Sequence, residues 1–184
     1  GLSLKELGRF EEAALSYERA LELKPDLVEG YTGLGNVLTE LGRLTEAEES
    51  YKRATALKPD FAEAYSNLGN TQRELDKLEE AEANCKKAIT LKPDFAEAYN
   101  NLGITLQQLG KLEEAEICCR KAIALKPDLA NAYINMGIIL QGKGDSGRAI
   151  NNFIEAIKIK PDNPDAYANL AIALSGTVFT EPNL

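Results

Sequence analysis

The fold of this chain is decided by a near-duplication, which reads AEAYSNLGNTQRELDKLEEAEANCKKAITLKPDF at residues 62–95 and AEAYNNLGITLQQLGKLEEAEICCRKAIALKPDL at residues 96–129. The two copies are identical at 23 of 34 positions. The tripeptide Lys-Pro-Asp extends the same 34-residue period outward, at 24–26, 58–60, 92–94, 126–128 and 160–162. A fixed period of this length is typical of a solenoid, in which each repeat buries its apolar face against the next one.

Each repeat is predicted to form two helices. The first runs roughly over 62–75, where Tyr65, Leu68 and Gly69 recur near helical spacing. The second runs roughly over 78–91 and ends before Pro93, because proline cannot continue a helix. The all-α class follows from this pattern.

Capping residues are predicted at both ends of the first helix. Asp60 precedes it and Glu63 follows three residues later, which is the spacing of an N-cap with a capping box. The same pair recurs as Asp26 with Glu29 and as Asp94 with Glu97. A left-handed residue is expected to close the first helix at Gly8, Gly42, Gly110 and Gly144, and at Asp76 in the remaining repeat.

Small residues recur at fixed places in the repeat and predict close helix packing. One such column contains Gly35, Gly69, Gly103, Gly137 and Ala171, and a second contains Ala13, Ala47, Ala81, Ala115 and Ala149. Larger residues of the Tyr and Leu columns fill the remaining space. Because one hairpin cannot bury both of its faces, each hairpin needs a neighbour.

The period and these columns resemble the tetratricopeptide repeat (TPR) family, with tyrosine in place of the signature tryptophan. The resemblance implies a right-handed superhelical solenoid of antiparallel hairpins whose first helices line a concave wall. It divides the chain into a partial repeat at 1–27, full repeats at 28–61, 62–95, 96–129 and 130–163, a lone first helix at 164–175 and a non-repeat tail at 176–184. Both ends have the pattern of a piece of a longer protein.

The wall predicted for the first helices carries an asparagine row. Its members are Asn67, Asn101, Asn135 and Asn169. A primary amide has both donors and an acceptor, so it can pair with the backbone of an extended peptide whatever its sequence. The row is similar to the one in the TPR arm of O-GlcNAc transferase. A structural alternative is that each amide bridges neighbouring first helices.

The remaining wall residues change in character along the chain. The early part is polar and acidic, with Asn36, Asn70, Arg73, Glu40 and Glu74, which favours a partner with some basic character. The later part contains Ile104, Ile134, Ile138 and Ile172, together with Gln107. Isoleucines on a face expected to be wet indicate an apolar contact, unless they pack on one another. The predicted peptide-binding residues are Asn36, Asn67, Asn70, Arg73, Asn101, Ile104, Gln107, Asn135, Ile138 and Asn169.

Composition excludes several classes of function. The net charge of −8 disfavours nucleic-acid binding. The absence of histidine removes His-based catalysis and Cys/His zinc sites, so no catalytic residue, cofactor or metal is predicted. No apolar run reaches the roughly 18 residues of a membrane span, and the start lacks a signal sequence, so a cytoplasmic location without membrane contact is expected.

Two motifs that resemble reactive sites have structural explanations. The segment Gly142–Gly147 spells G-x-G-x-x-G, but it follows a helix and falls on a predicted turn, whereas a dinucleotide site needs a preceding strand. Cys85 and Cys119 occupy the column held by Tyr51 and Phe153, so we expect them to be small core residues.

Three functions remain compatible with the sequence. The leading hypothesis is a non-catalytic protein-interaction scaffold that holds an extended peptide or a partner helix along the wall. A second is the substrate-recruiting arm of a larger, transferase-like enzyme whose catalytic domain lies outside residues 1–184. A third is self-assembly into homo-oligomers through uncapped array ends. Binding of acidic chaperone tails is rejected, because the matching columns contain no lysine or arginine.

Overall fold

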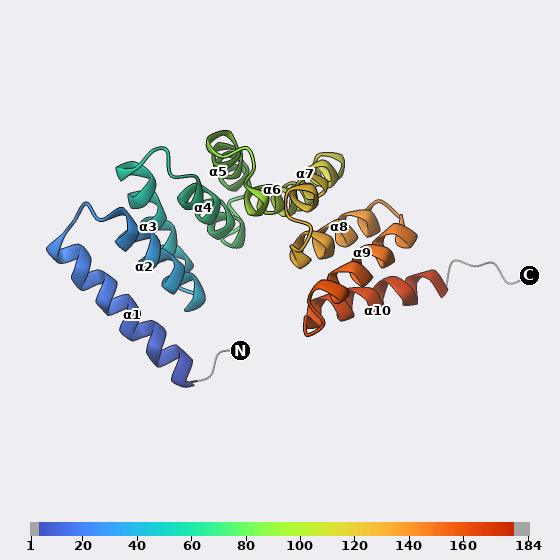
Figure 1. Ribbon diagram of the computed structural model, residues 1–184, viewed down its shortest axis with the longest axis horizontal. Coiled ribbons are helices and arrows are strands. Elements are labelled where there is room, and N and C mark those ends of the chain that lie inside the picture. Colours follow the sequence, from blue (N-terminus) through green and yellow to red (C-terminus); the bar gives the residue numbers. More distant parts are fainter. Residues whose placement is uncertain (1–3, 179–184) are drawn as a thin grey trace, which may run out of the picture. The chain divides into compact units, whose positions relative to one another are not determined.

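The computed structural model describes residues 4–178 of the chain, with side chains described over 8–175. Within that range every regular element is a helix, which confirms the predicted all-α class (Figure 1). The helices are α1 (Leu4–Leu23), α2 (Val28–Glu40), α3 (Leu44–Leu57), α4 (Ala62–Glu74), α5 (Leu78–Leu91), α6 (Ala96–Gln108), α7 (Leu112–Leu125), α8 (Ala130–Gly142), α9 (Ser146–Ile159) and α10 (Pro164–Val178). The last helix extends three residues past the predicted 175, and the rest of the predicted tail lies outside the described residues.

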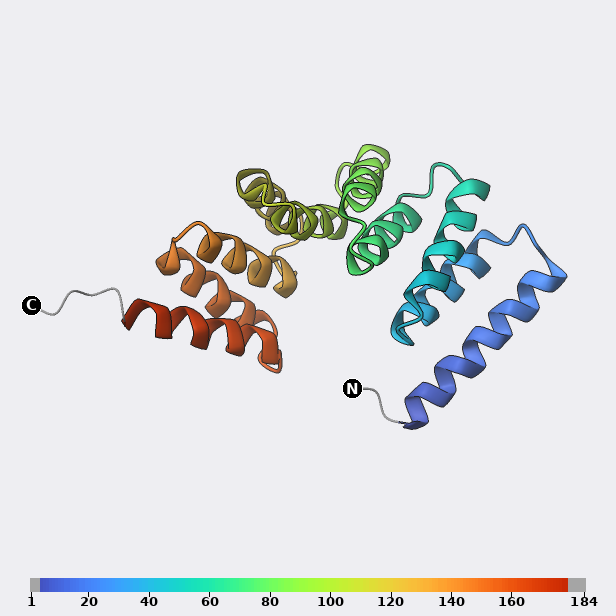
Figure 2. The same ribbon diagram turned by 180° about the vertical axis from the view of Figure 1, so that it is seen from behind.

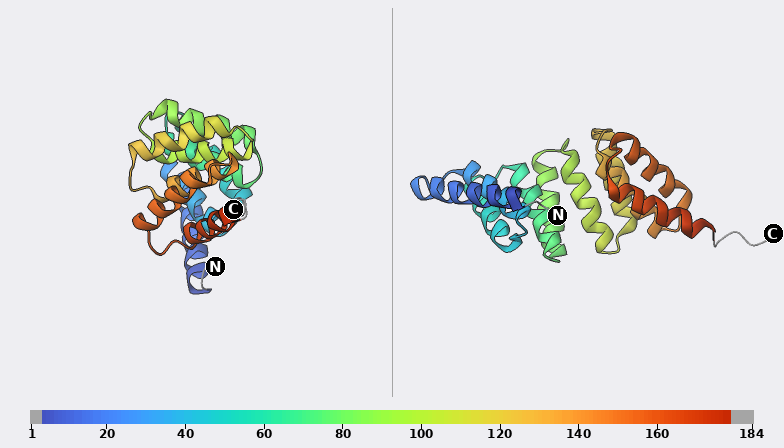
Figure 3. Two further views of the ribbon diagram at one scale, coloured as in Figure 1. Left: turned by 90° about the vertical axis from the view of Figure 1, so that its right-hand side faces the viewer. Right: turned by 90° about the horizontal axis from the view of Figure 1, so that it is seen from below.

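The chain forms two compact bodies, Gly1–Pro93 and Asp94–Leu184. In the first body α2 pairs with α3 and α4 with α5 as hairpins, while α1 packs on α2 and α3 on α4 (Figure 2). In the second body α6 pairs with α7 and α8 with α9, while α7 packs on α8 and α10 on α9 (Figure 3). Each body is therefore a stack of hairpins in chain order, as the repeat predicts.

The predicted left-handed residues close four of the first helices. Gly42, Gly110 and Gly144 have φ of +73°, +75° and +80°, and Asp76 has φ of +59°. The prediction is wrong at Gly8, because α1 runs through this residue without a break. In the described residues, Leu4 to Gly8 form the first turns of α1 itself and not the end of a separate helix. The backbone instead satisfies its hydrogen bonds by continuing one helix.

Replacing Gly8 by alanine is therefore expected to raise stability by about 0.5–1 kcal/mol, because alanine favours a helix interior over glycine. No atom lies within 4 Å of the added methyl group. Gly110→Ala is the opposite control, since its left-handed backbone costs an alanine about 1–2 kcal/mol. Thermal melts followed by circular dichroism compare the two variants. Destabilisation by both would place Gly8 in a turn after all.

The predicted capping boxes are not formed. The residues at the N-cap of α4 and α6 are Phe61 and Phe95, and no side chain caps either helix. The aspartates stand one residue too early, within the preceding turn. The glutamates instead bind lysines at the far end of the same hairpin: Glu63 lies 3.0 Å from Nζ of Lys92, and the equivalent pair Glu97 and Lys126 lies at 2.7 Å. Each ion pair joins the start of a first helix to the residue that ends its second helix.

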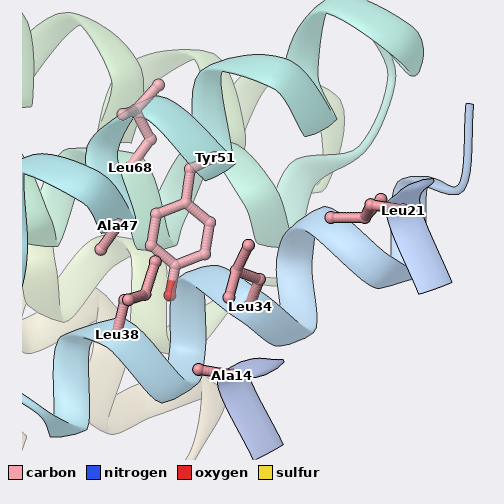
Figure 4. Packing of buried hydrophobic residues seen from close by; sticks show 7 residues of the cluster. All are labelled: Ala14, Leu21, Leu34, Leu38, Ala47, Tyr51 and Leu68. Carbon is pink, nitrogen blue, oxygen red and sulfur yellow. The ribbon is translucent and has the colours of Figure 1, made fainter. Parts of the chain in front are cut away.

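The glycine column allows the two helices of a hairpin to approach closely. A Cβ atom on Gly35 would lie 2.6 Å from the Tyr51 ring, and one on Gly137 would lie 2.4 Å from the Phe153 ring. Figure 4 shows the Tyr51 ring among the apolar residues of the first core, near Leu34, Leu38 and Leu68. A side chain larger than hydrogen at either glycine would displace the ring that packs on it.

The cysteines at the equivalent places are core residues, as predicted. Cys85 and Cys119 are buried, and neither forms a disulfide. A Cβ atom on Gly69 would lie 2.7 Å from Sγ of Cys85, and one on Gly103 would lie 2.6 Å from Sγ of Cys119. Burial raises the pKa of the Cys119 thiol to about 12, so this group stays protonated and unreactive near neutral pH.

A buried carboxylate joins neighbouring hairpins in each body. In the first, Glu48 of α3 accepts hydrogen bonds from Gln72 at 3.1 Å and from Lys77 at 2.6 Å, both on the next hairpin, and pairs with Lys52 at 3.0 Å. In the second, Glu116 of α7 pairs with Lys143 at 2.7 Å. These contacts add a charged link to the apolar packing between hairpins.

The segment Gly142–Gly147 lies where α8 ends and α9 begins, as predicted. Asp145 caps α9, since its Oδ1 accepts a hydrogen bond from the Arg148 backbone N–H at 3.0 Å. Lys143 is committed to Glu116. The glycines therefore belong to an ordinary helix-to-helix turn.

Candidate functional site

In the first body, several predicted binding residues gather around one hollow, which we call the amide hollow. Its volume is about 360 Å³. It is lined by Asn36, Thr39 and Glu40 of α2, Tyr51 of α3, and Asn67, Asn70 and Thr71 of α4. It thus lies on the first helices, with one contribution from a second helix.

The floor of the amide hollow is held by hydrogen bonds that converge on Asn36. Its Oδ1 accepts from the Tyr51 hydroxyl at 2.7 Å and from Nδ2 of Asn67 at 3.1 Å. Asn67 therefore bridges two neighbouring first helices, as the structural alternative predicts. The bond uses one N–H of the Asn67 amide and leaves its carbonyl oxygen for another partner.

The amide hollow is bordered by two carboxylates and one guanidinium. Glu40 lines it directly. Glu74 accepts from Asn70 at 3.1 Å and from Arg73 at 3.2 Å, and Arg73 also donates to Asn70 at 3.0 Å. Burial raises the pKa of the Tyr51 phenol, and the negative charges of Glu40 and Glu74 raise it further. The local balance is negative, with Arg73 engaged by its own helix.

A smaller hollow lies in the second body, which we call the isoleucine hollow. Its volume is about 50 Å³. It is lined by Ile104 and Gln107 of α6 and by Asn135, Ile138 and Ile139 of α8. Four of these five residues are predicted binding residues, and Ile139 is the addition. Nδ2 of Asn135 donates to Oδ1 of Asn100 at 2.8 Å, a second amide bridge between first helices.

Other wall residues lie elsewhere than predicted. Ile134 is only 6% exposed, and the equivalent Ser66 and Asn100 are also buried, so this column faces the interior and its assignment to the wall was wrong. Helical periodicity alone could not separate this column from its neighbour one residue later, because both lie near the edge of the apolar stripe. Asn169 and Asn101 line neither hollow; the Asn169 amide donates to the Asp165 carbonyl of its own helix at 2.8 Å.

Tyr51 is a site residue that the sequence reasoning assigned only to the core. Its ring packs across Gly35, and this brings its hydroxyl to Asn36 on the first-helix side. The sequence could have indicated this role, because Tyr51 has a hydroxyl that the residues at the equivalent positions of the later repeats, cysteine and phenylalanine, lack. A buried tyrosine opposite glycine needs a partner for that hydroxyl.

Two other kinds of site were sought among the described residues. Within them, no cluster of three Cys, Asp or Glu side chains is placed to hold a metal ion. None of the described helices combines the length and the apolar character that crossing a bilayer would require.

Solved structures with the same fold include several repeat proteins. A crystal structure of MamA is 28% identical, with 88% of this chain and 96% of that chain covered and a TM-score of 0.72. YrrB, described as a TPR protein with an unusual peptide-binding site, is 26% identical over 90% of this chain and 85% of its own, with a TM-score of 0.67. TTC0263, a thermophilic TPR protein from Thermus thermophilus, is 25% identical over 94% of both chains, with a TM-score of 0.78.

Family profiles cover most of the sequence. A profile described as TPR repeat matches residues 1–39 and 35–76, and two described as tetratricopeptide repeat match 62–95 and 94–162. Comparison with curated proteins finds no match. The profiles agree with the stacked hairpins and with the 34-residue period, and the chain therefore belongs to the tetratricopeptide repeat family.

Proposed function

We propose that this chain is a non-catalytic scaffold that binds an extended, partly basic peptide on the surfaces of its first helices. Proteins of this repeat family are in general protein-interaction scaffolds, and the peptide-binding site named for YrrB supports the same use here. The observation that carries the proposal is the amide hollow, where three predicted binding residues come together. The hollow is open, polar and next to two carboxylates.

The amide hollow offers two kinds of contact to a peptide. The Asn67 carbonyl oxygen can accept a backbone N–H, which requires no particular side chain. Glu40 and Glu74 can pair with a lysine or arginine side chain, and a volume of about 360 Å³ leaves room for a long one. Basic residues in the peptide would then set specificity and the rate of association.

The isoleucine hollow suits a different group. At about 50 Å³ it is much smaller than the amide hollow. Its walls are mostly aliphatic, with the side-chain amides of Asn135 and Gln107 as the polar part. We expect it to take a small apolar side chain, whereas the amide hollow suits a basic one.

A peptide array probed with the labelled 184-residue chain tests the proposal, followed by titrations of selected peptides. Glu40→Gln is expected to weaken binding of a lysine- or arginine-containing peptide about 3- to 10-fold and to reduce its dependence on salt. Asn67→Ala is expected to weaken basic and neutral peptides alike. Glu79→Gln, an exposed change at the start of α5, is the control and should bind as the unaltered chain does.

Two outcomes contradict the proposal. One is an array without any bound peptide, and the other is unchanged affinity in both Glu40→Gln and Asn67→Ala. In the second case the amide bridges are structural, and binding must be sought away from the amide hollow. The recruiting-arm hypothesis predicts the same peptide contacts and differs only in sequence outside residues 1–184, so it stays a prediction, as does a cytoplasmic location.

A further inference from the structure

The two carboxylates beside the amide hollow stand at equivalent places of neighbouring repeats, but their surroundings differ. Glu40 is the last residue of α2, and Glu74 is the last residue of α4. Glu40 lines the hollow, is exposed, and has no hydrogen-bond or ion-pair partner among the described residues. The residue before it, Thr39, donates its hydroxyl to the Gly35 carbonyl of its own helix at 2.9 Å. Glu40 is therefore free to bind a cation of a ligand.

Glu74 is instead held in a closed ring of hydrogen bonds. Its Oε1 accepts from the Asn70 amide at 3.1 Å and from Nη2 of Arg73 at 3.2 Å. The same Nη2 donates to Oδ1 of Asn70 at 3.0 Å, which closes the ring. The Arg73 side chain is only 17% exposed, so solvent ions screen this pair less than a pair at the open surface. Arg73 therefore neutralises Glu74 beside the hollow.

The arginine is specific to this repeat. Among the four complete repeats, Arg73 is the only charged member of its column, and the others are Thr39, Gln107 and Gln141. The next column contains glutamate only in the first two of these repeats, as Glu40 and Glu74. The second glutamate is thus the one with a cation beside it, and the hollow has one free and one neutralised carboxylate.

We propose that Arg73 limits the amide hollow to a single basic side chain, because it neutralises Glu74 and leaves Glu40 as the one carboxylate open to a ligand. This inference rests on the proposed function and narrows its ligand class to peptides with an isolated lysine or arginine. Two negative charges and one positive charge beside the hollow leave one negative charge, which one basic residue balances. A second basic residue beside the first would meet the Arg73 guanidinium and gain little affinity.

The burial of Arg73 decides what this residue can do. Its Nε is buried and has no hydrogen-bond acceptor among the described residues. A ligand carboxylate cannot reach that N–H without a rearrangement, so Nε is not a binding group for an acidic ligand. Replacing an unsatisfied buried donor by an apolar group of similar shape costs little stability. Arg73→Met should therefore release Glu74 and Asn70 while the chain stays folded.

Peptide arrays probed with the unaltered 184-residue chain and with Arg73→Met test the proposal. They compare short peptides that carry one lysine with the same peptides carrying a second lysine at each other position in turn, and titrations of matched pairs give the ratio of affinities. The unaltered chain should bind both classes similarly, whereas Arg73→Met should prefer two lysines about 3- to 10-fold. Adding Glu74→Gln to Arg73→Met should abolish that preference, since no second carboxylate is left.

Arg53→Met is the matched control, because Arg53 is an exposed arginine of α3 whose loss changes the net charge by the same amount. Its ratio of affinities should equal that of the unaltered chain. An equal rise in Arg53→Met and Arg73→Met would assign the effect to overall charge and overturn the proposal. Circular dichroism checks that each variant stays helical. Arg73→Gln, which introduces the residue type of the next two repeats, replaces Arg73→Met if the latter unfolds.

The possible results distinguish this inference from the proposed function. Binding of one-lysine peptides by the unaltered chain, with no rise of the ratio in Arg73→Met, overturns the inference and leaves the proposed function standing. Binding by Arg73→Met alone, with a preference for two lysines, supports the inference and contradicts the proposed function of the unaltered chain. Absence of binding by both chains contradicts both.

Discussion

Replacing Phe153 by alanine is expected to lower the free energy of unfolding by about 3–5 kcal/mol, the largest loss expected from any single side chain in this structure. Phe153 is fully buried and is the bulkiest of the fully buried side chains in the described chain. Its removal leaves a cavity next to Gly137 that the packed helices α8 and α9 cannot close. Urea unfolding followed by circular dichroism measures the change.

Gly137→Ala tests the reason for this loss. Alone it should destabilise by about 1–3 kcal/mol, because its methyl group would lie 2.4 Å from the Phe153 ring. In the Phe153→Ala background the ring is absent and that cost should disappear, so the two effects should be strongly non-additive. Gly147→Ala is the control in the same hairpin, since the nearest side-chain atom lies 4.0 Å away. Additive effects would mean that the ring does not lie on Gly137.

Replacing Glu48 by glutamine is expected to cost on the order of 1–3 kcal/mol at neutral pH. Burial of Glu48 opposes its ionisation, but hydrogen bonds from Lys77, Lys52 and Gln72 outweigh that effect and lower its pKa to about 2. The range extends to low values because the side chains of Lys52 and Lys77 are nearly half exposed, and their hydration weakens the attraction to Glu48. Glu49→Gln, at the exposed neighbouring residue, should change stability little.

The contribution of Glu48 depends on pH in a definite direction. Because its pKa is lower in the folded chain than the ordinary 4.5, the stabilisation is complete above pH 4.5 and is lost as the pH falls toward about 2. The difference between the unaltered chain and Glu48→Gln should shrink over that interval in urea titrations at several pH values. A difference that is constant with pH would assign the effect to packing and not to charge.

The fold could be predicted from the sequence because the repeat states the same arrangement several times. Lys-Pro-Asp, the glycine column and the alanine column each fix one feature of the hairpin, and the copies agree. The turn predicted at Gly8 was wrong although the local sequence matches the other turns. A turn also requires a preceding helix that packs against the following one, and here Gly8 lies inside α1. The capping boxes failed by one residue, since Phe61 and Phe95 occupy the N-cap positions.

The candidate site was predicted only in part. The polar columns predicted Asn36, Asn67 and Asn70 on the same side of the first helices, and the three line one hollow, while their role in binding stays a prediction. The sequence could not show that Ile134 lies inside, since an isoleucine is suited to both a wet apolar contact and a core. The bridges from Asn67 to Asn36 and from Asn135 to Asn100 join different columns, so the three-dimensional stacking of the hairpins was needed to find them.

Because Gly35 of α2 has no side chain, there is room between the first and second helices of its hairpin. The ring of Tyr51 extends through this space from the second helix, so that its hydroxyl reaches Asn36 on the first-helix surface. At Gly69 and Gly103 the equivalent space is filled by a cysteine, which is too short to reach that surface. At Gly137 it is filled by a phenylalanine, which has no polar group. One substitution on a second helix can thus add a polar group to the first-helix surface, or remove one, without altering any residue of the first helix. The chemistry of that surface can therefore change in evolution while the sequence of the first helices stays the same.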